Sequence, residues 1–259
     1  MSQTRPVASP SIPSVTILGV RVDAVTMPQT LAWVEAAVTA AADERRPRQI
    51  CTANPEFLMT ARRDPEFRRV LNAADLVLPD GVGLLWAARR LGGRLPERVA
   101  GSDLIYRLAE LAGGHGWRVY FLGAAEGVAR AAAERLRALN PGLVIAGTFA
   151  GDPSPAAAGA LVAGVRAARP ELLLVAYGAP AQDKWIARHK DELGVPVSMG
   201  VGGSFDFVAG VAQRAPAWAQ RAGLEWLHRL WRQPWRAGRI FSAVVAFPLA
   251  VLANRRQRD

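Results

Sequence analysis

Short apolar segments alternate with longer segments of helical periodicity along most of the chain, and this alternation limits the fold to a few classes. The apolar segments show no alternation of polar and apolar residues, which is typical of strands buried on both faces. Strands of this kind occur in parallel sheets, where each connection between neighbouring strands is a helix that covers the sheet. The sequence therefore predicts an α/β fold with a mainly parallel sheet flanked by helices.

The individual elements follow from the same pattern. Residues 15–25 predict two short strands around a turn at Gly19. Six further strands are expected at residues 48–53, 75–79, 117–123, 143–149, 171–178 and 195–203, and helices at 27–41, 54–74, 80–91, 101–114, 124–139, 155–168 and 180–193. We expect three regions: a Pro/Ser-rich flexible leader at residues 1–14, a catalytic domain at 15–210, and a C-terminal appendage at 211–259.

The C-terminal appendage differs in character from the rest of the chain. It contains nine arginines against two acidic residues, which is +7 of the net charge of +10, and four of the eight tryptophans. Basic and aromatic residues beside an apolar segment are typical of a helix that lies in a membrane interface. A basic helix packed on the domain is the alternative, and nucleic acid is not expected as a partner. The apolar run at 241–252 contains Pro248 and is shorter than the ~20 residues that span a bilayer.

The residues suited to metal binding are few and scattered. Cys51 is the only cysteine, so neither a disulfide within the chain nor a multi-cysteine metal site can form. His115, His189 and His228 lack the spacing of metal ligands, and no Asp-x-Asp motif is present. We therefore expect no metal and no cofactor. The leader has no apolar core and does not predict a signal peptide, and a single cysteine is compatible with a reducing cytoplasm.

Polar residues follow two of the predicted strands, where ligands bind in parallel sheets. Thr52 and Asn54 end the strand at 48–53, and Asp80 follows the strand at 75–79. An asparagine before Pro55 is also a common helix N-cap, and Asp80 could equally cap the helix that follows it. The functional hypothesis is that Asp80 is a general base at the mouth of the sheet.

Two later strand ends predict ligand contacts as well. Gln182 lies in the first turn of the helix that follows Gly178, where its amide could bind a sugar hydroxyl or be solvated. Gly202 and Gly203 form the exit of the strand segment at 195–203, and a glycine-rich exit can present backbone N–H groups to phosphate. Asp206, just beyond it, could accept a hydrogen bond from a ribose or a base.

Taken together, these segments resemble the WecG/TagA/CpsF glycosyltransferase family, glycosyltransferase family 26. The resemblance covers residues from about 15 to 240, and it depends on the order and spacing of the motifs TANPEF, ADLVLPDGVGLLWAAR, LPERVAGSDL, YGAPAQDKW, GVGGSFDFVAG and RAPAWAQRAGLEWLHRLWRQPWRAGR. It implies a Rossmann-like core with a C-terminal membrane-targeting appendage. It also implies inverting, metal-independent transfer of a sugar from a UDP-sugar to a polyprenyl-diphosphate-linked acceptor.

The resemblance also implies roles for individual residues. Asp80 matches the general base, and without a metal the leaving UDP would be stabilised by arginines, whose planar guanidinium groups bind phosphate in a bidentate manner. The catalytic residues implied are Asp80, Arg229, Arg236 and Arg239, and the substrate-binding residues are Thr52, Asn54, Arg98, Gln182, Gly202, Gly203 and Asp206.

Other classes of function remain open on the residues alone. An NAD-linked α/β enzyme would bind a nucleotide at the same sheet edge, although the chain lacks the G-x-G-x-x-G fingerprint. A non-catalytic membrane scaffold would need no Asp80. The donor could be N-acetylmannosamine, its uronic acid or glucose. We expect a cytoplasmic enzyme that is peripheral on the inner face of the cell membrane, attracted by its anionic surface, and a homo-oligomer is compatible with the sequence.

Overall fold

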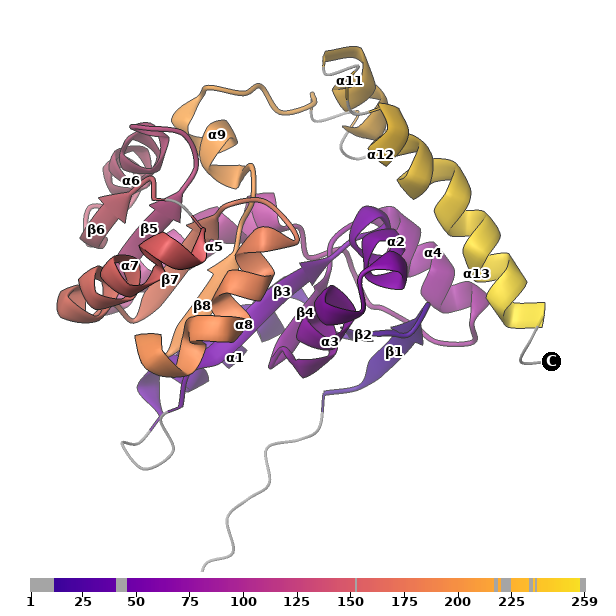
Figure 1. Ribbon diagram of the computed structural model, residues 1–259, viewed down its shortest axis with the longest axis horizontal. Coiled ribbons are helices and arrows are strands. Elements are labelled where there is room, and N and C mark those ends of the chain that lie inside the picture. The colour runs from indigo at the N-terminus through magenta and orange to yellow at the C-terminus, as the bar shows by residue number, and fades with distance from the viewer. Residues whose placement is uncertain are drawn as a thin grey trace, which may run out of the picture.

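The computed structural model describes residues 12–40, 46–151, 153–216, 219, 225–232, 235 and 237–256. A six-stranded sheet of order β4-β3-β8-β7-β5-β6 forms the centre of the molecule, with helices on both faces (Figure 1). All neighbouring strands of this sheet pair in parallel. The predicted Rossmann-like α/β fold is therefore confirmed.

The strands lie close to their predicted positions. A separate antiparallel hairpin pairs β1 with β2 around the turn at Gly19. The strands are β1 Ser14–Ile17, β2 Val20–Asp23, β3 Arg48–Ala53, β4 Leu76–Pro79, β5 Arg118–Gly123, β6 Val144–Phe149, β7 Leu172–Ala176 and β8 Val197–Gly200. Residues 1–11, which make up most of the predicted leader, lie outside the described residues.

The helices lie close to their predicted positions, but one predicted helix is split in two and α9 was not predicted. The predicted helix at 54–74 is two helices, because Pro65 disfavours the helical conformation at Asp64 and lacks an N–H for the ladder. Asp64 instead caps the second helix through a hydrogen bond from the Phe67 N–H. The helices of the body are α1 Met27–Thr39, α2 Pro55–Arg63, α3 Pro65–Ala73, α4 Val82–Arg90, α5 Gly101–His115, α6 Val128–Leu139, α7 Pro155–Ala168, α8 Ala181–Leu193 and α9 Ser204–Ala209.

Alternate residues of each strand fill two opposite faces of the sheet. Ile50, Phe121 and Met199 pack in the core beneath α1, α5 and α6. Cys51 and Val77 point the other way, into the core shared with α2, α3 and α4. Burial on both faces explains why these strands show no polar alternation.

The C-terminal appendage forms a long helix that lies against the body. Its elements are α11 Glu225–Arg232, α12 Ala237–Phe241, the π-helical segment η2 Ser242–Ala246 and α13 Phe247–Arg256. Figure 1 shows the last three as one continuous yellow helix beside α4 and α2. Phe247 and Val251 are fully buried against these helices. We call α12, η2 and α13 together the tail helix.

The tail helix corrects the expectation that the apolar segment is too short to span a membrane. The helix passes through Pro248, because the π-helical turn before it places the Phe247 N–H on the carbonyl of Ser242, five residues earlier. Its residues Ala237–Asn254 have a mean hydropathy of 1.6 and are 11% buried. By length and composition alone, this helix is long enough to cross a membrane.

Candidate active site

The carboxyl ends of β3, β4, β7 and β8 meet at a cavity of about 430 Å³. Thr52 and Asn54 reach it from β3, Asp80 from β4, Gly178 from β7 and Gly202 from β8. The cavity lies where the chain changes direction across the sheet. From β3 the chain continues to β4 on one side, and it then crosses to β5, β6, β7 and β8 on the other side. Parallel α/β sheets bind their ligands at such a position.

Asp80 lines this cavity and is not the N-cap of α4. That position belongs to Gly81, and no side chain caps the helix. The Asp80 backbone N–H donates to the carbonyl of Ala53, and its Oδ2 accepts a hydrogen bond of 3.3 Å from the Gly101 N–H at the start of α5. The positive end of a 15-residue helix thus faces the carboxylate. The alternative of an ordinary helix cap on α4 is wrong.

Asn54 has both roles that the sequence left open. Its Oδ1 caps α2 by accepting from the Phe57 N–H at 2.9 Å, while the residue also lines the cavity. The cap uses only the amide oxygen, which leaves the amide N–H groups for a ligand. Thr52 is buried beside Asn54, and the absence of a side chain at Gly101 leaves room for its methyl group.

Gln182 joins two of the strand exits and is not solvated, because only 1% of it is exposed. Its Oε1 accepts hydrogen bonds from the N–H groups of Gly178, at 3.1 Å, and Gly202, at 2.9 Å. A side chain at Gly200 would approach the Gln182 Nε2 to 2.6 Å, so glycine is required there. Gln182 therefore holds the loops after β7 and β8 in place.

The glycine-rich segment beyond β8 forms one wall of the cavity. Gly202, Gly203 and Asp206 all line it, and Gly202 has a positive φ of 50°. That conformation favours glycine and brings the backbone close to the cavity. Asp80 lines the same cavity, and the contact of this segment with a nucleotide remains a prediction.

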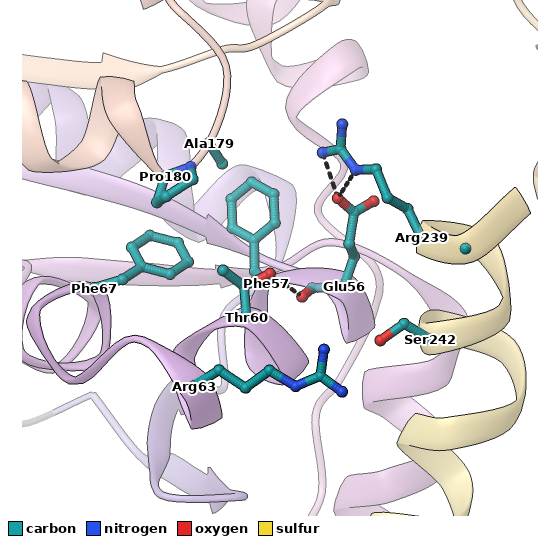
Figure 2. Close-up of a pocket in the computed structure, with 10 residues that line it drawn as sticks. Glu56, Phe57, Thr60, Arg63, Phe67, Ala179, Pro180, Arg239 and Ser242 are labelled. Carbon is teal, nitrogen blue, oxygen red and sulfur yellow. Dashed lines mark hydrogen bonds and ion pairs between the residues drawn. The ribbon is translucent and has the colours of Figure 1, made fainter. Parts of the chain in front are cut away.

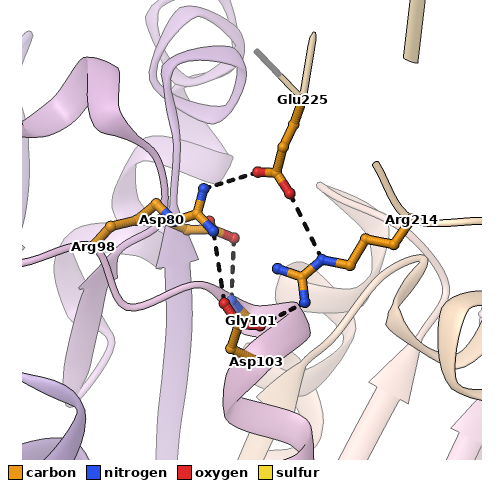
Figure 3. A network of polar contacts seen from close by, with 6 residues as sticks. All are labelled: Asp80, Arg98, Gly101, Asp103, Arg214 and Glu225. Carbon is orange, nitrogen blue, oxygen red and sulfur yellow. Dashed lines mark hydrogen bonds and ion pairs between the residues drawn. The ribbon is translucent and has the colours of Figure 1, made fainter. Parts of the chain in front are cut away.

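A network of charged side chains surrounds the start of α5, beside Asp80 (Figure 3). Arg98 contacts Glu225 at 2.8 Å and Asp103 at 3.6 Å. Arg214 contacts Asp103 at 2.5 Å and Glu225 at 3.7 Å. Burial raises the pKa of the Asp103 carboxyl, but the hydrogen bond and charge of Arg214 together with the charge of Arg98 lower it below its ordinary value. The network therefore keeps Asp103 ionised and fixes two guanidinium groups near Asp80.

The comparison with known proteins agrees with this geometry. The family described as "Glycosyl transferase WecG/TagA/CpsF family" matches residues 15–259. The chain belongs to the WecG/TagA/CpsF glycosyltransferase family. It is therefore an enzyme that transfers a glycosyl group, and the alternatives of an NAD-linked enzyme and a non-catalytic scaffold are not supported.

Three relatives carry the same printed name, "N-acetylglucosaminyldiphosphoundecaprenol N-acetyl-beta-D-mannosaminyltransferase". The protein of Bacillus subtilis (strain 168) is 33% identical over 217 residues, which are 83% of each chain. That of Bacillus spizizenii is 35% identical over 214 residues, 83% of this chain and 82% of the relative. That of Staphylococcus aureus (strain MW2) is 30% identical over 246 residues, 93% of this chain and 94% of the relative.

The arginines expected to complete the site of this WecG/TagA/CpsF glycosyltransferase differ in their positions. Arg239 lines the cavity and forms an ion pair with Glu56 of α2. Arg98 does not line the cavity but contacts Glu225, which does. Arg229 lies in α11, where its side chain is outside the described part of the structure, and Arg236 is outside it altogether.

Reasoning from the sequence missed several charged residues of the site, among them Glu56, Arg214 and Glu225. Arg214 and Glu225 line the cavity, and Asp103 connects Arg214 with Arg98. The signal was present, because Arg214 and Glu225 both fall within the last motif of the resemblance. The hydrogen bond from Arg214 to Asp103 joins the appendage to α5, more than 100 residues earlier, so no local pattern could predict it.

A buried acidic group lies directly behind the cavity. Asp183 follows Gln182 and is fully buried, and within the described part of the chain neither of its carboxylate oxygens has a hydrogen-bond partner of good geometry. Burial raises its pKa to about 7, although the nearby Cys51 thiol and Gln182 amide partly oppose this effect. Burial also raises the pKa of Cys51 well above its ordinary value. The lone cysteine is therefore a buried thiol and a poor nucleophile.

Proposed function

We propose that this glycosyltransferase moves a sugar from a UDP-sugar to a polyprenyl-diphosphate-linked saccharide in cell-surface polysaccharide synthesis. The observation that carries the proposal is the position of Asp80, which lines the cavity and does not cap α4. The names of the relatives support an acceptor that is a diphosphoundecaprenol-linked sugar. They also favour N-acetylmannosamine over its uronic acid and glucose as the donor sugar.

The reaction we propose is a single displacement. The acceptor hydroxyl oxygen attacks the anomeric carbon of the donor, and its proton passes to the Asp80 carboxylate. The bond between the anomeric carbon and the phosphate oxygen breaks, and UDP leaves with the electron pair. One displacement inverts the anomeric configuration. A positioned carboxylate base contributes about 10²–10⁴-fold to such a step.

Guanidinium groups are suited to stabilise the charge that develops on UDP. Arg214 and Arg239 line the same cavity as Asp80. Among the described residues, no group of three or more His, Cys, Asp or Glu side chains is arranged to hold a metal ion. We propose metal-independent transfer, as the family resemblance implies, with fixed cations and the N–H group of Gly203 facing the diphosphate.

The test is a transfer assay with the full-length protein. A panel of UDP-sugars is offered together with a polyprenyl-diphosphate-linked N-acetylglucosamine, in the presence of EDTA. We expect UDP release and a disaccharide product with UDP-N-acetylmannosamine, and an inverted anomeric centre by NMR. A strict requirement for a divalent cation, or a retained configuration, would contradict the mechanism.

We also propose that the enzyme is peripheral on the inner face of the cell membrane. Phe241, Val245, Leu249 and Leu252 form a stripe along the tail helix and are between 40% and 62% exposed. Their spacing places them on the face opposite to the buried Phe247 and Val251, so one face packs on the body while the other remains free for lipid. Arginines follow at the end of the helix in the sequence, where they favour an anionic surface. This arrangement supports a helix that lies on the membrane.

Removing the stripe is expected to release the enzyme from lipid. Phe241→Gln with Leu249→Gln should weaken binding to vesicles with 30% anionic lipid by at least about tenfold, since each large apolar side chain contributes about 1.5–3 kcal/mol when buried. Flotation of the vesicles measures the bound fraction. Leu139→Gln, at an exposed leucine of α6, is the matched control and should bind as the wild type does. Equal binding by the double variant would contradict the proposed orientation.

A further inference from the structure

A second cavity of about 470 Å³ adjoins the first, between the body and the tail helix. Glu56, Phe57, Ala179 and Arg239 line both cavities. Figure 2 shows Glu56 and Arg63 extending from α2 toward the tail helix, which carries Arg239 and Ser242. The ion pair between Glu56 and Arg239 therefore stands at the boundary of the two cavities.

The second cavity lies between the general base and the lipid-facing stripe. Asp80 lines the first cavity but not the second, and Ser242 lines the second but not the first. Ser242 follows directly on Phe241, the first residue of the exposed stripe. A substrate with a sugar at one end and a lipid at the other would pass through the second cavity on its way from Asp80 to the membrane.

The chemistry of the second cavity suits an anion attached to an apolar chain. Arg63 lines it and is exposed, and among the described residues no carboxylate lies within ion-pair distance of its guanidinium group. Ser242 adds a hydroxyl group from the tail helix. Phe57 and Phe67 form an apolar wall, with ring centroids 5.7 Å apart. Arginine and hydroxyl groups together are suited to phosphate oxygens.

The volume of the first cavity supports a separate place for the acceptor diphosphate. A nucleotide-sugar is a ligand of the size that fills about 300–1,000 Å³, and the first cavity provides about 430 Å³. The donor diphosphate already has Arg214 and the glycine-rich wall there. The second diphosphate of the reaction, that of the acceptor, needs space and a cation outside it.

We infer that the second cavity binds the diphosphate of the lipid-linked acceptor, with Arg63 as its cation and Ser242 as a hydrogen-bond donor. The acceptor sugar then reaches Asp80 past Glu56 and Arg239, and the prenyl chain leaves along Phe241 and Val245. This inference rests on the proposed function and adds an acceptor subsite to it. The subsite is completed only when the tail helix is docked on α2.

The test compares two adjacent arginines of α2. Arg63→Gln should raise the KM for the polyprenyl-diphosphate acceptor by about tenfold or more, the effect expected from losing a charge-assisted hydrogen bond. Its affinity for UDP, measured by calorimetry, should stay within twofold. Arg62→Gln is the matched control, because Arg62 does not line either cavity and its Nη1 lies at the Met59 sulfur. A second variant, Ser242→Trp, should fill the cavity and raise the same KM.

A change of acceptor shows whether Arg63 recognises the diphosphate or the sugar. With a phosphate-free alkyl glycoside of the acceptor sugar, Arg63→Gln and the wild type should have the same KM. An unchanged acceptor KM in both Arg63→Gln and Ser242→Trp would overturn the inference, as would a rise in the KM for the donor instead. Direct binding of the polyprenyl-diphosphate saccharide to the variants gives the same answer without turnover. Failure of the wild type to transfer any sugar would overturn the proposed function and leave that binding result intact.

Discussion

Asp80→Asn is expected to lower kcat/KM for glycosyl transfer by about 10²–10⁴-fold, the usual contribution of a positioned general base. Asparagine keeps an oxygen that can accept from the Gly101 N–H, so the fold of the loop should persist. It cannot take a proton from the acceptor hydroxyl. The loss should therefore appear in kcat, with little change in the affinity for UDP.

The transfer assay with EDTA measures this effect, and calorimetry measures the affinity for UDP. Asp191→Asn, at an exposed aspartate of α8, is the control for the loss of one carboxylate and should remain fully active. Retention of more than a tenth of the wild-type kcat by Asp80→Asn would remove Asp80 from the role of base. A parallel loss of UDP affinity would indicate a binding role instead.

Phe247→Ala is expected to detach the tail helix from the body. Phe247 is fully buried against α2 and α4, where its ring lies near Gly83. Truncation of a buried phenylalanine costs about 3–5 kcal/mol. Few other side chains hold this helix in place, since only 11% of Ala237–Asn254 is buried. Arg239 would then leave the first cavity and Ser242 the second, so transfer should fall by at least about tenfold.

Hydrogen exchange along residues 237–256 measures the docking of the tail helix. Protection should be lost in Phe247→Ala and kept in the strands of the main sheet. Leu249→Ala is the matched control, since Leu249 is 62% exposed on the opposite face and its truncation should change docking by less than about 0.5 kcal/mol. Unchanged protection in Phe247→Ala would show that other contacts hold the helix.

The order of elements and the edge of the sheet that carries the site could be predicted from the sequence. Residues 48–53 form β3 with the predicted bounds, because Pro47 before them and the helix start at Asn54-Pro55 after them interrupt regular structure on both sides. Thr52, Asn54, Asp80 and Gly202 meet at one edge, because parallel strands bring their carboxyl ends together. The break before Pro65 was equally legible from the chemistry of proline, yet we predicted one helix there.

The roles within the site depended on contacts that no local pattern contains. The sequence could not exclude Asp80 as the cap of α4, and the structure excluded it by showing that Gly81 holds that position. Gln182 proved to hold two backbone N–H groups that lie 24 residues apart along the chain, at Gly178 and Gly202.

The sequence by itself determined the α/β class, the positions of the strands and the basic, apolar character of the appendage. Only the tertiary structure decided that Arg214 and Glu225 join the start of α5 and that the tail helix covers α2, creating the second cavity. The physical reason is that periodicity reports which face of a segment is buried. It contains no information about which distant surface covers that face, because this depends on packing between whole elements.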